Sequence, residues 1–71
     1  MDNFAVVSEI FIDESGNSSV NSAVYKDMTA GISAFYNKAQ YIPLFKDKGY
    51  KAVIIIDQSG QNILPPVIRK N

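Results

Sequence analysis

The sequence predicts an α+β domain of order ββαββ: a four-stranded antiparallel sheet with one helix packed on one face. Residues 4–12 and 50–56 are rich in β-branched and aromatic side chains, and both end in the turn phrase Ile-Asp-x-Ser-Gly. Apolar residues recur at helical spacing between these two stretches. The chain has 71 residues and no linker-like segment, so we expect a single domain over residues 1–71.

The first hairpin is predicted to join a strand at 4–12 to a more polar strand at 20–25. In its turn, Asp13 is placed to accept hydrogen bonds from backbone N–H groups, and Gly16 to supply a positive φ. Asp57 and Gly60 repeat these roles in the second hairpin. A calcium loop fits poorly, because it needs alternating oxygen ligands and a distal acidic residue. A carboxylate dyad is disfavoured because the predicted sheet places the two aspartates at opposite ends.

The helix is expected to begin at an Asp27 cap and to run through Tyr41 or Ile42, where Pro43 ends it. One face of this helix carries the apolar residues Met28, Ile32, Phe35, Ala39 and Ile42. Residues 43–49 are compatible with one further turn, closed by a glycine.

The third strand, at 50–56, is predicted to be central, and the fourth, at 62–68, to lie at an edge. Pro65 and Pro66 cannot donate hydrogen bonds to a sheet ladder, which favours the edge position. A right-handed crossover from the second strand to the third leaves room for the first strand between them. The predicted strand order is therefore 2-1-3-4.

Side-chain alternation in these hairpins separates two faces, and both are mostly apolar. We expect the helix to cover the first face, which holds Phe4, Val6, Ile10, Ile12, Val20, Val24, Ala52, Ile54, Ile56 and Leu64. The second face contains Glu9 and Lys51, yet it is too apolar for a solvated sheet surface. It is the predicted interface, formed by Val7, Phe11, Tyr25, Val53, Ile55, Ile63 and Val67. A homodimer is the simplest cover for it, and a host protein is the rival partner.

The composition narrows the function classes. No His and no Cys are present, so the common metal sites and nucleophile–base arrangements are missing; we expect no cofactor and no enzymatic activity. A net charge of zero disfavours nucleic acid as a partner. Two alternatives remain: a nucleic-acid-associated factor that uses the basic second half, and a ligand-binding or catalytic subunit with its site across a dimer.

Localisation is expected to be cytoplasmic. No stretch has the length of a membrane span, so no membrane contact is predicted. The residues after Met1 lack the basic and apolar pattern of a signal peptide.

The segments "FIDESGN", "ISAFYNKA" and "YKAVIIIDQSGQNI" together resemble small ββαββ proteins carried by phages and mobile elements of Gram-positive bacteria. The resemblance covers nearly the whole chain and is carried by turns and hydrophobic spacing. The ending "LPPVI" departs from the charged ending expected of such proteins. Many of them act by binding a host or defence protein, so the resemblance implies an accessory or inhibitor protein of a mobile element.

Overall fold

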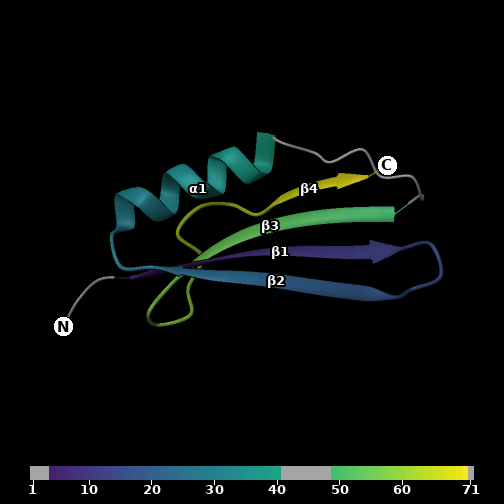
Figure 1. The fold of residues 1–71 in the computed structure, drawn as a ribbon, viewed down its shortest axis with the longest axis horizontal. Coiled ribbons are helices and arrows are strands. Elements are labelled where there is room, and N and C mark those ends of the chain that lie inside the picture. Colours follow the sequence, from purple (N-terminus) through teal and green to yellow (C-terminus); the bar gives the residue numbers. More distant parts are fainter. Residues whose placement is uncertain (1–3, 41–48, 71) are drawn as a thin grey trace.

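A computed structural model describes residues 4–40 and 49–70, and it confirms the ββαββ fold and the strand order (Figure 1). The described elements form one sheet of order β2-β1-β3-β4, in which every neighbouring pair is antiparallel. Their bounds are β1 Ala5–Asp13, β2 Ser18–Tyr25, α1 Met28–Gln40, β3 Gly49–Asp57 and β4 Val67–Lys70.

Both predicted hairpin turns are present, with the predicted residues in their predicted roles. The Oδ1 atom of Asp13 accepts hydrogen bonds from the backbone N–H groups two and four residues later, both at 2.9 Å. Asp57 does the same at 2.9 and 3.0 Å. Gly16 and Gly60 have φ angles of 87° and 84°, a region that favours glycine. The two turns lie at opposite ends of the sheet (Figure 1), so the carboxylates of Asp13 and Asp57 do not meet within one chain.

The helix begins at the predicted cap, where Thr29 N donates to Asp27 Oδ1 at 3.1 Å. Phe35 is buried, and Met28 and Ile32 pack beside it against the sheet. The predicted end of the helix at Tyr41 or Ile42, with most of the turn at 43–49, lies outside the described residues. No helix in the described ranges is long and apolar enough to cross a membrane.

The fourth strand lies at the predicted edge, but its predicted bounds of 62–68 are wrong, because β4 spans Val67–Lys70. Asn62 forms an isolated bridge with Ile56, and the ladder resumes only where Val67 pairs with Val53. If the Ile56–Asn62 register continued, Val53 would pair with Pro65. It pairs with Val67 instead, so the later chain has slipped by two residues. The two prolines between these points lack N–H groups, which explains the interruption.

The helix covers the face that the sequence analysis placed outside, so the predicted interface is wrong. Three central members of that predicted interface, Val7, Val53 and Ile55, are buried beneath α1. They form the core together with Ala5 and Phe35. The other predicted interface residues also belong to the helix side. Tyr25, Ile63 and Val67 pack against the core, and Phe11 is half-buried beneath the Lys51 ammonium.

Small residues at the crossing of α1 and β1 give the physical reason for this docking. Gly31 lies so near the sheet that a Cβ atom there would be 2.8 Å from the Cβ of Ala5. The helix can therefore approach closely where Ala5 leaves space, and Phe35 fills the volume further along.

Candidate functional site

The sheet surface opposite α1 is the candidate site, and we call it the outer face. Alternation along the strands turns its side chains away from the buried core. Its apolar members are Val6, Ile10, Ile12, Val20, Val24, Tyr50, Ala52, Ile54, Ile56 and Ile68. Val20 and Val24 on the edge strand are 58% and 65% exposed. No described helix or strand packs on this face, so a mostly apolar surface meets solvent.

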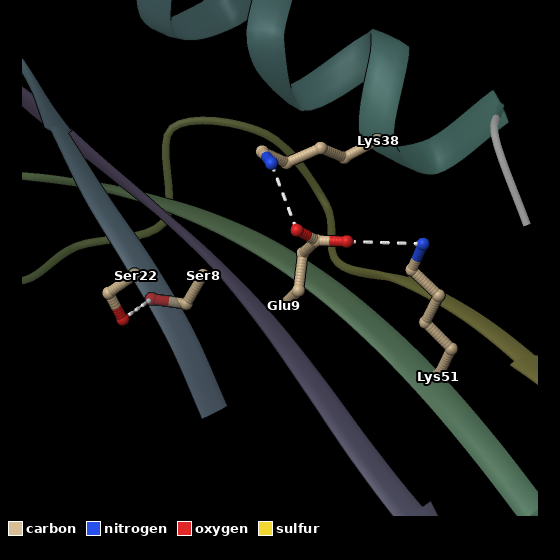
Figure 2. Close-up of polar contacts among 5 residues, drawn as sticks. All are labelled: Ser8, Glu9, Ser22, Lys38 and Lys51. Atoms are coloured by element: carbon tan, nitrogen blue, oxygen red, sulfur yellow. Dashed lines mark hydrogen bonds and ion pairs between the residues drawn. The ribbon is translucent and has the colours of Figure 1, made fainter. Parts of the chain in front are cut away.

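Three serines interrupt the apolar surface on the β1–β2 side, and two of them form a pair. Ser8 and Ser22 face each other across the strands, and their hydroxyl oxygens are 2.8 Å apart in a hydrogen bond (Figure 2). Ser8 is buried among its neighbours, whereas Ser22 remains exposed. Ser18 lies at the start of the edge strand. Within the described residues, Lys70 on β4 is the charged member of the outer face.

Glu9 is on the helix side, where it lies between two lysines (Figure 2). Its Oε1 atom is 2.9 Å from Lys38 Nζ on α1, and its Oε2 atom is 3.2 Å from Lys51 Nζ on β3. The Glu9 side chain is 16% exposed and that of Lys51 only 2%. Burial alone raises the pKa of Glu9, but hydrogen bonds and charge from both lysines outweigh it and lower the pKa overall. The hydrogen bond to Glu9 raises the pKa of Lys38.

This ion cluster explains how two charged residues of the strands can lie on the face that the helix covers. Glu9 and Lys51 satisfy each other's charge beside the helix, and Lys38 adds a second cation from α1. Alternation along the strands places Glu9 and Lys51 on the same face as Val7 and Val53, but it does not show which face the helix covers.

A small cleft lies on the helix side beside the ion cluster. Its volume is about 70 Å³, well below the roughly 300–1,000 Å³ of typical small-molecule sites. The lining residues are Val7, Glu9, Asn21, Ser22, Ala23 and Lys38. In the described parts of the chain, no group of three His, Cys, Asp or Glu residues is arranged to hold a metal ion. The cleft is therefore small for a small-molecule site.

Comparison with family models, with curated proteins and with solved structures finds no match to this chain.

Proposed function

We propose that this protein is a small, non-enzymatic interaction module that forms a homodimer through the outer face. The observation that carries the proposal is the apolar surface opposite the helix. In a two-layer domain with one solvated sheet face, that face is normally polar. Here it holds ten apolar side chains, several of them more than half exposed in the single chain.

Charge makes a second copy a suitable occupant. A two-fold axis places the same patch of both subunits against itself, so a charged patch would repel its own copy. Across β2, β1 and β3 the outer face carries apolar and serine side chains, and Lys70 lies apart on the short edge strand. The central surface is therefore compatible with itself.

The area of the outer face is sufficient for a modest dimer. Nine-residue strands are about 30 Å long, and three strands at about 4.8 Å spacing give a flat area of about 400 Å². Protruding side chains and β4 increase this value, so two stacked faces bury about 1,000 Å² in total, the lower limit for a specific interface. The solvent-accessible surface of the single chain is 5024 Å², whereas that of a compact monomer of this mass is about 4,400 Å². The single chain therefore exposes more surface than is usual for its mass.

The accessory or inhibitor role implied by the phage-like segments belongs to the same proposal, with the dimer as the acting unit. A host protein on the outer face is the competing occupant. It would leave the isolated chain monomeric, and this outcome is measurable.

Val20→Asp is expected to abolish the dimer without unfolding the subunit. Val20 is exposed on the edge strand, so an aspartate there is solvated in the monomer. In the dimer it would place two desolvated carboxylates on an apolar interface. Sedimentation velocity of the variant at about 50 µM, where a micromolar dimer is mostly assembled, should show the monomer mass.

Ser19→Asp is the matched control, because Ser19 is the neighbouring exposed residue and points to the other side of the sheet. It should leave the dimer intact. Equal dissociation in both variants would mean that the assembly does not use the outer face.

A further inference from the structure

Large and small side chains alternate across the centre of the outer face. One row across β2, β1 and β3 is formed by Ser22, Ser8 and Ile54, and the next row by Val20, Ile10 and Ala52. On each strand, one of these two rows has a bulky residue and the other a small residue. The pattern holds for all three strands.

We propose that the two-fold axis of the dimer crosses the strands midway between these two rows. This inference rests on the proposed homodimer and specifies its register. Each strand then lies over its own copy in the opposite direction. Ser8 packs against Ile10 of the second copy, Ser22 against its Val20, and Ala52 against its Ile54.

Packing between sheets gives the physical reason. Face-to-face sheets lie about 10 Å apart, and their inner side chains must interdigitate to reach the density of a protein interior. The proposed axis places a bulky residue opposite a small one at each central contact. An axis along β1 would instead place Ser8 on Ser8 and Ile10 on Ile10, which leaves a void beside an overpacked contact.

The serine hydroxyls are compatible with this burial. Ser8 and Ser22 already share a hydrogen bond of 2.8 Å, which satisfies one hydroxyl hydrogen within the subunit. When side chains of the second copy cover the pair, one hydroxyl hydrogen keeps its hydrogen bond. Two isolated serines would both lose their bonds to water. Both serine side chains are small, so they leave room for the Ile10 and Val20 side chains of the second copy.

Two single variants and their mixture test the register. Ser8→Ile faces isoleucine with isoleucine in its homodimer, and Ile10→Ser faces serine with serine. The dissociation constant of each variant homodimer should be at least roughly tenfold higher than that of the wild type. Mixing the two variants restores an isoleucine–serine contact at both positions. Native mass spectrometry should then show the heterodimer as the dominant dimer, because the two subunits differ in mass.

Ser8→Ile mixed with Ile54→Ser is the matched control, since these positions do not face each other in the proposed register. Their effects should add, so about half of the dimers should be mixed, as random pairing gives. Circular dichroism checks that each variant is folded. A monomeric wild type would overturn the homodimer and the register together. A dimeric wild type whose Ser8→Ile and Ile10→Ser mixture gives only random pairing would overturn the register alone.

Discussion

Phe35→Ala is expected to produce the largest loss of folding stability of any single truncation in this domain. Phe35 is the main helix residue in the core, buried against Val7, Val53 and Ile55. Truncation of a buried phenylalanine costs about 3–5 kcal/mol in lost burial and cavity formation. A domain of 71 residues has a total unfolding free energy of roughly 4–11 kcal/mol. Urea unfolding followed by circular dichroism should therefore show a greatly reduced midpoint.

Tyr36→Ala is the control for this experiment. Tyr36 is the next residue, exposed, and its ring meets that of Phe35 edge-on with centroids 5.6 Å apart. Its truncation should cost no more than about 1 kcal/mol. Equal losses for the two variants would contradict the assignment of Phe35 to the core.

Glu9→Gln is expected to destabilise the domain by about 3 kcal/mol at neutral pH, because it removes the carboxylate from beside a buried lysine. Lys51 is almost fully buried and lies 3.2 Å from Glu9. Lys38→Met is the comparison, because the Lys38 side chain is 33% exposed and its ammonium can be hydrated. That variant should lose roughly 0–1 kcal/mol. Chemical unfolding of both variants gives the two values.

Acid titration gives a second measure of the Glu9 contribution. The pKa of Glu9 is lowered by folding, so its contribution is fully present above the ordinary value of 4.5 and is lost as the pH falls towards the folded-state pKa. The wild type should lose stability through this range, and Glu9→Gln should lose less. Part of the acid sensitivity should remain in the variant, because hydrogen bonds from the Ser59 hydroxyl and from nearby backbone N–H groups lower the pKa of Asp57 as well. Identical acid profiles would mean that the ion cluster adds nothing to folding.

The features that the sequence could predict are mostly local. Asp13, Gly16, Asp57 and Gly60 form turns through contacts within four residues, so their spacing alone was sufficient. The strand order followed from a chain-crossing rule and from strand composition. The exact pairing of β4 did not, because the chain after Asn62 slips by two residues around the prolines.

The outer face was predicted to exist, but its residues were exchanged with those of the core. Alternation shows which side chains share a face, and it is equally consistent with either face lying under the helix. The choice depended on a long-range contact, the close approach of Gly31 to Ala5. It also depended on the Lys38 ammonium reaching Glu9, a contact between residues 29 positions apart. Neither contact has a sequence pattern that single-strand periodicity reveals.

Sedimentation equilibrium of the unmodified protein distinguishes the proposed homodimer from a monomer. Over about 1–100 µM, a range that brackets a micromolar dissociation constant, we expect the apparent mass to rise from 7.8 kDa towards twice that value. Raised salt should weaken the association little, because the outer face buries apolar rather than charged groups. A mass that stays at 7.8 kDa over the whole range would contradict the claim that the outer face closes a homodimer.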